Sequence, residues 1–385
     1  MNPAEPLTLQ APGAIAPRVA VVGAGMAGAT CAAALRQAGW AVTVVDKARG
    51  PGGRMATRRA AWRDAAGGEH AAWWHHGAPS FEVTSVDFAA QVAAWAEAGW
   101  VLPSASRADD GLRRWQAAGA QPGLCRALLD GVDNHWASAV GSVARDGAGW
   151  WLGVGANPLK ATVSIGPFDA VVLALPPAQA APLLAPHEAD WARASALVGM
   201  QPCWTLLGVV RHGVAEAVDG GAGADTGAWP DALDQPLPHR SGGVLASARR
   251  QSLPPGEPDW PAGHEAWVLH ATAGWSTRHL EDTPEQVVQQ LTAAWAALWA
   301  EPPVWISCAA HRWRYARPAV APWAGSVGSR WHPGAGLGQC GDHLAGTGVE
   351  AAWRSGRALA QAMLADPPKL LASSAGRRCP ADQAS

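Results

Sequence analysis

The chain has 385 residues, 49% of them hydrophobic, and a formal net charge of −2 at pH 7. This balance predicts no basic face for nucleic acid or for a membrane surface, and no apolar run approaches the ~20 residues that cross a bilayer. At about 100–200 residues per domain, the length predicts two domains.

The cysteines, at positions 31, 125, 203, 308, 340 and 379, form no Cys-x-x-Cys pair and show no zinc-ligand spacing. We interpret them as free thiols in a reducing cytoplasm, and we expect no metal site. Residues 1–17 lack the pattern of a secretory signal. They and residues 366–385 are expected to be flexible ends.

The first elements form a βαβ unit. Residues 18–22 are an apolar run typical of a buried parallel strand, and the Ala-rich segment 27–38 predicts a helix that ends at Gly39. Residues 40–45 predict a second strand. Strand, Gly-rich turn, helix and strand within about 30 residues indicate a right-handed βαβ unit.

Later segments continue the α/β pattern. We expect a Gly- and Arg-rich loop at 47–60, helices at 88–99 and from 122 to 129, and a buried strand at 168–175. Residues 137–144 and 149–154 predict a hairpin around Asp146-Gly147. Residues 185–315 mix helices and strands, with a Gly/Pro-rich insert at 218–264, and 336–364 predict a strand, a Gly-rich turn and a helix.

The segment Gly23-Ala24-Gly25-Met26-Ala27-Gly28 follows the first strand and opens the first helix. Gly23 permits the tight turn, Gly25 lets the backbone approach a pyrophosphate, and Gly28 lets the helix pack closely. The N–H groups at the helix start, around Met26 and Ala27, can bind the diphosphate. Asp46 ends the second strand, 23 residues after Gly23, and can accept hydrogen bonds from the ribose of an adenosine. The pattern predicts dinucleotide binding.

Residues 46–59 favour FAD over NAD. Their Gly-Gly-Arg, just after the second strand, resembles the second FAD motif of the amine-oxidase-like flavoproteins, where the loop is a second cradle for the pyrophosphate. Arg54 can bind phosphate as a charge-assisted donor. The alternative is a basic surface loop. From this loop we expect cofactor contacts by Lys47, Arg49, Gly53, Arg54 and Met55.

Residues 337–359 resemble the C-terminal FAD motif of the same group. The resemblance implies that Gly341-Asp342 ends a strand and that Asp342 binds the ribityl chain. The helix that starts at Gly348-Val349-Glu350 would point at the pyrimidine side of the flavin, where its dipole favours negative charge on reduction. A simple Gly-rich turn is the alternative.

The motifs together resemble the renalase-like FAD-dependent oxidoreductases of bacteria, within the flavin amine oxidase superfamily. Segments 46–59, 122–128, 311–318 and 340–356 carry the likeness. It implies non-covalent FAD, a small donor such as a dihydronicotinamide or an amine, and dioxygen as electron acceptor. It also implies an α/β Rossmann-like FAD-binding domain and a second substrate domain of mixed or antiparallel sheet plus helices.

We therefore expect the two domains to alternate along the chain. The FAD-binding domain is expected at 18–70, 121–180 and 316–365, and the substrate domain at 71–120 and 181–315.

The stretch 74–81 departs from the family pattern Asp-x-Gly-Ala-Gln-Tyr-Phe. His75 stands near the Asp position and Pro79-Ser80 replace Gln-Tyr, so the identity of the substrate is open. His75 and His76 can bind or deprotonate a substrate, or they can be ordinary loop histidines.

Few catalytic residues are expected beyond the flavin, because the cofactor takes the hydride. His76, His311 and Tyr315 are the catalytic candidates; Arg312 can also contact substrate or flavin. Tyr315 is the only Tyr in the chain, and a plain packing role is equally compatible with it. Three functions remain open: a renalase-like oxidase, an amine oxidase or desaturase of a specialised metabolite, and a flavin-binding scaffold or redox sensor without turnover.

Overall fold

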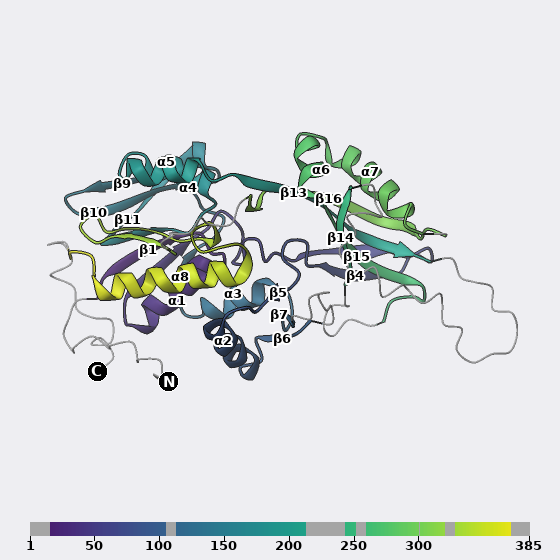
Figure 1. Ribbon diagram of the computed structural model, residues 1–385, viewed down its shortest axis with the longest axis horizontal. Helices are drawn as coiled ribbons and strands as arrows, with labels where there is room; N and C mark the ends of the chain where they lie inside the picture. The colour runs from purple at the N-terminus through teal and green to yellow at the C-terminus, as the bar shows by residue number, and fades with distance from the viewer. Residues whose placement is uncertain are drawn as a thin grey trace, which may run out of the picture. The chain divides into compact units, whose positions relative to one another are not determined.

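The computed structural model describes residues 16–104, 113–212, 243–251, 259–299, 301–319 and 328–370. They fall into two compact units, each assembled from separate stretches of chain (Figure 1). The first unit contains the described residues of 1–53, 122–199 and 318–385, and the second contains those of 54–121 and 200–317.

These boundaries differ from the expected ones in two main segments. Residues 54–70, expected in the first domain, lie in the second unit because strand β3 (Arg58–Arg63) pairs antiparallel with β4 (Glu69–Trp74) there. Residues 181–199, expected in the second domain, lie in the first unit. There, helices α4 (Pro177–Leu184) and α5 (Ala189–Ala196) contribute buried side chains to the unit's hydrophobic core. Residues 121 and 316–317 also lie in the second unit.

The first unit is built on a six-stranded sheet in the order β17-β18-β12-β1-β2-β8. Its strands are β1 (Arg18–Val22), β2 (Ala41–Val45), β8 (Asp133–His135), β12 (Ala170–Leu173), β17 (Arg330–His332) and β18 (Leu337–Gln339). All neighbours are parallel except the edge pair β17–β18. In chain order the parallel strands read 3-2-1-4-5, the doubly wound order of dinucleotide-binding folds. The predicted βαβ unit and the fold class are confirmed.

Helix α1 (Met26–Gln37) ends before Gly39, whose φ of +88° lets the chain turn back into β2. Helix α8 (Gly348–Ala365) lies beside α1 (Figure 1). The approach is close, because a Cβ at Gly356 would clash with the carbonyl oxygen of Ala27. Helix α3 (Pro122–Leu128) occupies the predicted position.

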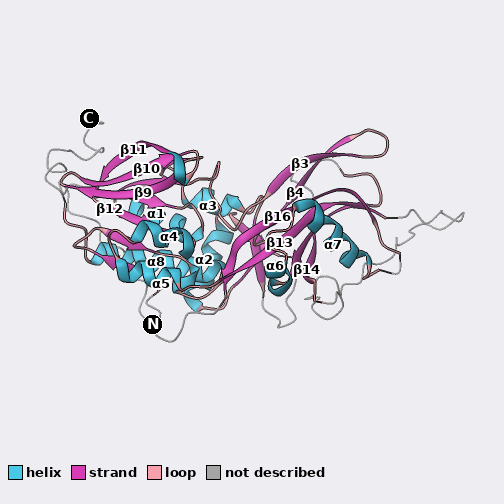
Figure 2. Cartoon of the chain, turned by 90° about the horizontal axis from the view of Figure 1, so that it is seen from above, coloured by secondary structure: helices cyan, strands magenta, loops and turns pink. Residues whose placement is uncertain are grey.

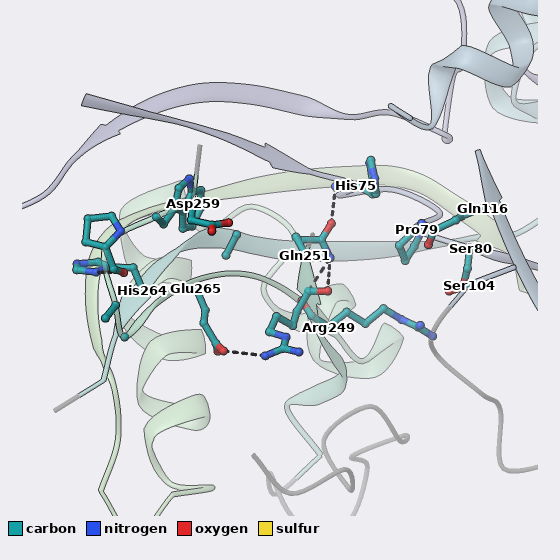
Figure 3. Close-up of a pocket in the computed structure, with 16 residues that line it drawn as sticks. His75, Pro79, Ser80, Ser104, Gln116, Arg249, Gln251, Asp259, His264 and Glu265 are labelled. Carbon is teal, nitrogen blue, oxygen red and sulfur yellow. Dashed lines mark hydrogen bonds and ion pairs between the residues drawn. The ribbon is translucent and has the colours of Figure 1, made fainter. Parts of the chain in front are cut away.

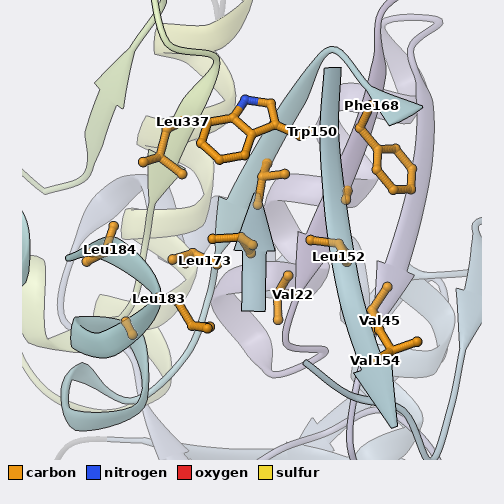
Figure 4. Close-up of a cluster of buried hydrophobic side chains, with 14 of the residues drawn as sticks. Val22, Val45, Trp150, Leu152, Val154, Phe168, Leu173, Leu183, Leu184 and Leu337 are labelled. Carbon is orange, nitrogen blue, oxygen red and sulfur yellow. The ribbon is translucent and has the colours of Figure 1, made fainter. Parts of the chain in front are cut away.

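A three-stranded antiparallel sheet, β11-β10-β9, is inserted between β8 and β12. Strands β9 (Ala139–Asp146) and β10 (Gly149–Gly155) form the predicted hairpin, and β11 (Ala161–Phe168) follows a short 3-10 helix, Pro158–Lys160. Its buried side chains share one core with the six-stranded sheet and with α4 (Figure 4). Labelled members of this core are Val22, Val45, Trp150, Leu152, Val154, Phe168, Leu173, Leu183, Leu184 and Leu337.

The second unit is built on an antiparallel sheet in the order β14-β15-β13-β16. The strands are β13 (Met200–Arg211), β14 (Leu245–Gln251), β15 (His264–Ala271) and β16 (Val304–Pro318). Buried side chains alternate between the two faces: Leu206 packs with helix α7 (Pro284–Ala296), whereas Leu207 packs with Trp62 and Trp74 of the β3–β4 hairpin. Helix α7 begins with a capping box between Thr283 and Gln286.

The second unit also contains a small sheet, β5-β7-β6, whose strands are labelled in Figure 1. Two further helices, α2 and α6, are labelled in Figure 2. The strands are β5 (Phe81–Glu82), β6 (Val101–Pro103) and β7 (Arg114–Ala117). Helix α2 (Val86–Glu97) begins and ends two residues before the expected bounds, and α6 (Ala273–Arg278) follows β15.

Some expectations fall near or beyond the described residues. The segment 218–242 of the Gly/Pro-rich insert lies outside them, as do 1–15 and 371–385. Pro17 and Asp366, expected in flexible ends, are held in place: their carbonyl oxygens accept hydrogen bonds from the Ala41 N–H and the Trp331 indole. Among the described residues, no helix is both long and apolar enough to span a membrane.

Candidate cofactor and substrate sites

The Gly-rich turn lies where the strand order of the first unit reverses. Strand β1 lies between β2 and β12, and Gly23 follows its carboxyl end with a φ of +107°. Its N–H donates to Val45 O at 2.9 Å, and a Cβ at this position would clash with the carbonyl of Ala174, at the end of β12. Open α/β sheets bind ligands at this kind of crossing.

Gly25 and Gly53 bring two loops against each other without side chains. Gly25 is the N-cap of α1, and a Cβ added at Gly53 would lie 3.2 Å from the Cα atom of Gly25. The Gly52 N–H donates to Ala24 O at 2.9 Å and fixes this approach. No side chain caps the start of α1. Bare glycine backbone at an uncapped helix start is a suitable cradle for a diphosphate.

Asp46 anchors the Gly-rich turn, a role that the sequence reasoning missed. Its two carboxylate oxygens accept the N–H groups of Ala24 and Ala48, each at 2.7 Å. The bond to the N–H two residues ahead is an Asx-type turn, and this type of signal can be read from an Asp at a strand end. Because each carboxylate oxygen has two lone pairs, Asp46 retains capacity for a ribose hydroxyl.

The other residues expected from the second loop are divided between the units. Lys47 and Arg49 are exposed in the first unit, and Lys47 Nζ donates to Gln179 Oε1 at 3.3 Å. Arg54 and the buried Met55 belong to the second unit, where Arg54 Nη1 donates to Ala316 O at 3.0 Å.

The C-terminal motif follows the short strand β18. Asp342 is buried in a 3-10 turn, Asp342–Leu344, and the Gly341 N–H donates to Ser355 Oγ of α8 at 2.9 Å. Helix α8 then begins at Gly348 (φ +84°), and its N-cap Thr347 makes no side-chain cap. Val349 is buried in this first turn, where Glu350 is the acidic residue. The first unit thus has a second uncapped helix start beside a buried carboxyl group.

Cys340 lies beside this motif as a fully buried thiol. Burial raises its pKa to about 12, so the thiol stays protonated at neutral pH and is a poor nucleophile. The other cysteines in the described part of the chain, Cys31, Cys125, Cys203 and Cys308, are also free.

In the second unit, the structure brings together two of the three catalytic candidates. The rings of His76 and His311 have centroids 4.8 Å apart and are nearly perpendicular. The Trp313 ring lies 4.5 Å from His311 and 5.1 Å from His76. Tyr315 lies two residues farther along β16, so strand alternation places it on the same face, half-buried. Arg312 and Arg314 point to the opposite face, where both bind Glu281.

The histidine pair is held in its neutral form. Burial, followed by the electrostatic effects of His311, Arg58 and His270, lowers the pKa of His76 to about 4, although a hydrogen bond with the Trp74 main chain acts in the opposite direction. Burial and then Arg58 also lower the pKa of His311. The Nδ1 atom of His76 is buried with no hydrogen-bond partner among the described residues. A neutral imidazole can accept or donate a hydrogen bond, so this pair can orient a polar substrate group.

His270, which the sequence reasoning did not single out, supports this pair. Its Nε2 lies 3.2 Å from His76 O and 3.1 Å from Gly77 O, and its Nδ1 lies 3.3 Å from Ser247 Oγ. Burial lowers its pKa to about 4, so Nε2–H can donate to the two carbonyls from a neutral ring. No motif marks it, because the contact depends on how β15 packs against the segment after β4.

A cavity of about 570 Å³ lies elsewhere in the second unit (Figure 3). His75, Pro79 and Ser80 line it, which are the three residues that depart from the family pattern. His75 Nδ1 hydrogen bonds with Thr57 Oγ1 at 2.8 Å, and the His75 N–H donates to Gln251 Oε1 at 2.9 Å. Burial lowers the pKa of His75 to about 4.

Across the residues that the structure describes, no group of three or more His, Cys, Asp or Glu side chains could hold a metal ion.

Residues 21–90 match the family model of the NAD(P)-binding Rossmann-like domain. This match covers the Gly-rich turn, β2 and the second loop. It agrees with the doubly wound sheet that the first unit forms.

Solved structures share the fold over most of the chain. A putative protoporphyrinogen oxidase from Exiguobacterium sp. 255-15 has a TM-score of 0.62 at 9% identity, over 91% of this chain and 99% of that one. Cyclohexylamine oxidase from Brevibacterium oxydans IH-35A has a TM-score of 0.54 at 13% identity, with the same coverage. Wild-type putrescine oxidase bound to putrescine has a TM-score of 0.51 at 14% identity, also over 91% and 99%. The chain therefore has the fold of these oxidases, with a Rossmann-like unit and a second unit of antiparallel sheet and helices.

Proposed function

We propose that this protein is an FAD-dependent oxidoreductase that binds FAD non-covalently. The observation that carries the proposal is the approach of Gly25 to Gly53 at the uncapped start of α1. Two backbone loops meet there without side chains at the crossing point of a doubly wound sheet, and a dinucleotide diphosphate fits such a cradle.

Different residues of the first unit are proposed to bind different parts of FAD. Gly23, Gly25 and Gly28, with the helix start at Met26 and Ala27, would hold the diphosphate. The other contacts proposed from the first unit are Asp46, Lys47, Arg49, Gly53, Gly341, Asp342, Gly348, Val349 and Glu350. Arg54 and Met55, which belong to the second unit, are proposed as cofactor contacts too. Of these, Asp46 would bind the adenosine ribose and Asp342 the ribityl chain. The buried, protonated Cys340 thiol supports non-covalent binding.

Bound FAD supplies the redox chemistry, which is acceptance of a hydride equivalent from a small donor, with dioxygen as the proposed final electron acceptor. The chain's own contribution is to bind and orient the donor and to exclude water. His76, His311 and Tyr315 are proposed for that task, with His76 Nδ1 as a buried hydrogen-bonding atom. We place this activity in the cytoplasm, without nucleic-acid or membrane partners.

The donor is proposed to be a dihydronicotinamide-like molecule. The charged group that acts on both His76 and His311 is the Arg58 guanidinium. A neighbouring cation disfavours a protonated amine and accommodates a neutral or anionic donor. Phosphates of a nicotinamide nucleotide would be attracted to the same charge.

The first test is the visible spectrum of the purified protein, before and after anaerobic addition of NADH containing its dihydro-isomers. Oxidised-flavin bands that bleach and then return with air are the expected result. If a colourless protein cannot be reconstituted with FAD, the proposal fails. Flavin recovered in the pellet after acid precipitation would contradict non-covalent binding.

The second candidate is an amine oxidase or a desaturase of a specialised metabolite. The fold shared with proteins named cyclohexylamine oxidase and putrescine oxidase favours it. Bleaching by a primary amine, with none by dihydronicotinamides, would select it. Tight FAD that neither donors nor dithionite reduce would instead indicate a binding scaffold or a redox sensor.

A further inference from the structure

The cavity in the second unit has a hydrogen-bonding end that is built on two neighbouring strands. Phe81 of β5 lies opposite Trp115 of β7, and the two strands run antiparallel. This register, continued by one residue, places Ser80 opposite Gln116 on the same face, because side chains alternate along a strand. Both residues line the cavity, and Figure 3 labels them at the same end of it.

The side chains of Ser80 and Gln116 retain their full hydrogen-bonding capacity. Both residues are half-buried, and within the part of the chain that the structure describes neither side chain has a hydrogen-bond partner. The glutamine amide carries N–H donors beside a carbonyl acceptor, and the serine hydroxyl can donate one hydrogen bond and accept others. This end of the cavity therefore presents donors and acceptors side by side.

The charged side chains of the lining offset one another. Arg250 Nη1 donates to Glu265 Oε1 at 2.9 Å. The other two, Arg249 and Asp259, have opposite signs, so the arginine and carboxylate charges of the lining sum to zero. Burial lowers the pKa of His75 to about 4, and this histidine adds no charge at neutral pH. The lining thus has no excess charge with which to attract an ion.

Other lining residues supply apolar surface. They include Trp260, Pro79 and Ala266. The Trp260 indole N–H already donates to Ala71 O at 3.1 Å, so its ring offers apolar surface alone. Small-molecule sites combine such surface with a few placed polar groups, and the volume of about 570 Å³ lies within their usual range of roughly 300–1,000 Å³.

We infer that this cavity binds a small uncharged molecule that carries a carboxamide group on an apolar body, with the carboxamide at Gln116 and Ser80. Two amides pair through two N–H···O hydrogen bonds, because each offers a donor beside an acceptor. A carboxylate offers only acceptors and would set an oxygen against the Gln116 carbonyl oxygen. An amidinium offers only donors and would oppose the Gln116 NH₂ group. Either mismatch leaves polar groups without partners, which weakens binding.

Isothermal titration calorimetry on the protein as purified tests this inference, with benzamide, benzoate and benzamidine as probes. The three are planar and nearly equal in shape, and they are neutral, anionic and cationic at neutral pH. None has a hydrogen on the carbon attached to the ring, so none can give a hydride to a flavin from that position. Benzamide should bind saturably and at least about tenfold more tightly than either ion.

An isosteric variant of Gln116 tests where the probe binds. Gln116→Glu keeps the shape of the side chain and replaces its N–H donors by an oxygen, so it should weaken benzamide binding about tenfold or more. It should also strengthen benzamidine binding about tenfold, because a carboxylate and an amidinium form a charge-assisted pair. Misfolding cannot produce that gain. Gln289→Glu, the same change at an exposed residue of α7, is the matched control and should bind all three probes as the wild type does.

Three results would overturn the carboxamide site. They are a lack of saturable benzamide binding, binding of benzoate or benzamidine as tight as that of benzamide, and a Gln116→Glu variant that binds benzamide like the wild type or gains no affinity for benzamidine. No readout depends on flavin reduction, so this inference and the proposed function fail separately.

Discussion

Gly25 is the residue at which cofactor binding and backbone strain can be separated. Its φ of −74° is accessible to any residue, and the nearest atom to an added Cβ would be Gly53 Cα at 4.0 Å. Gly25→Ala should therefore fold, with at most about 1 kcal/mol lost at the helix N-cap. The methyl group would occupy the approach to the diphosphate, and FAD affinity should fall at least about tenfold.

Flavin-fluorescence titration of the apoprotein measures this affinity, and thermal unfolding without FAD measures the stability. Gly39→Ala is the matched control: its φ of +88° strains an added side chain, yet nothing lies within 4 Å. It should lower stability and leave FAD affinity unchanged. Equal FAD affinity for Gly25→Ala and the wild type would refute the cradle.

His76 is the residue whose removal should slow the reaction without releasing the cofactor. Because its buried Nδ1 has no described partner and its ring meets His311 at 4.8 Å, His76→Ala removes a fixed polar contact for the donor. Flavin reduction in anaerobic stopped-flow should slow about 100-fold. The flavin spectrum and content should match the wild type.

A control variant and the pH dependence of flavin reduction test the same role of His76. His70→Gln alters a histidine of the second unit that is bound to Asp64 at 2.8 Å, and it should reduce flavin normally. Since the pKa of His76 is about 4, its ring stays neutral down to about pH 5. Protonation of His76 should therefore lower the rate of flavin reduction only below about pH 5. A rate that is unchanged in His76→Ala would remove His76 from the mechanism.

At the scale of elements, the contact between α1 and α8 depends on a single glycine. Ala normally stabilises a helix interior by about 1 kcal/mol relative to Gly. At Gly356 the added Cβ would clash with the Ala27 main chain and force the two helices apart, so Gly356→Ala should destabilise the protein by about 2 kcal/mol.

Chemical denaturation measures this change in the free energy of unfolding. Gly274 is the matched helical glycine in α6, where the nearest atom to an added Cβ is Arg278 Nη1 at 3.8 Å. Gly274→Ala should be neutral or stabilising. If Gly356→Ala also raises the free energy of unfolding, then α1 and α8 do not approach each other as closely as described.

The same elements show what could be predicted from the sequence. Local signals placed β1, α1, β2 and the β9–β10 hairpin, because turn glycines and apolar periodicity act within a few residues. The hairpin β3–β4 was missed: its sequence, rich in Arg and exposed Ala, carries little alternation, and it is stabilised by packing Trp62 and Trp74 onto a sheet formed by residues beyond 200. Residues 181–199, which include the end of α4 and all of α5, were expected in the second domain and lie in the first unit, because their side chains pack into a core formed by distant strands.

The sites follow the same division between local and distant information. Glycine spacing predicted that Gly23, Gly25 and Gly53 bind the cofactor, whereas nothing local marked His270. The contacts of His270 arise from pairing within the β14-β15-β13-β16 sheet, which brings residues near 75 beside residues near 250 and 270.

For the whole molecule, the buried histidines predict sensitivity to mild acid. His75, His76 and His270 each have a pKa lowered by burial to about 4, and that of His311 is lowered too. As the pH falls, these histidines take up protons near pH 6.5 in the unfolded chain, but only at lower pH in the folded chain. The loss of folding stability that these histidines cause is absent above pH 6.5, grows as the pH falls toward about 4, and then levels off.

Stability should therefore fall between about pH 6.5 and pH 5, by up to about 1.4 kcal/mol per pH unit for each of these histidines. All four groups belong to the second unit. Hydrogen exchange corrected for intrinsic rates should show β13–β16 losing protection at pH 5, while β1, β2 and β12 of the first unit serve as the internal reference. His270→Gln, which retains a side-chain N–H donor, should make the pH dependence shallower. Equal loss of protection in both units, or an unchanged slope in this variant, would show that histidine burial does not control the acid response.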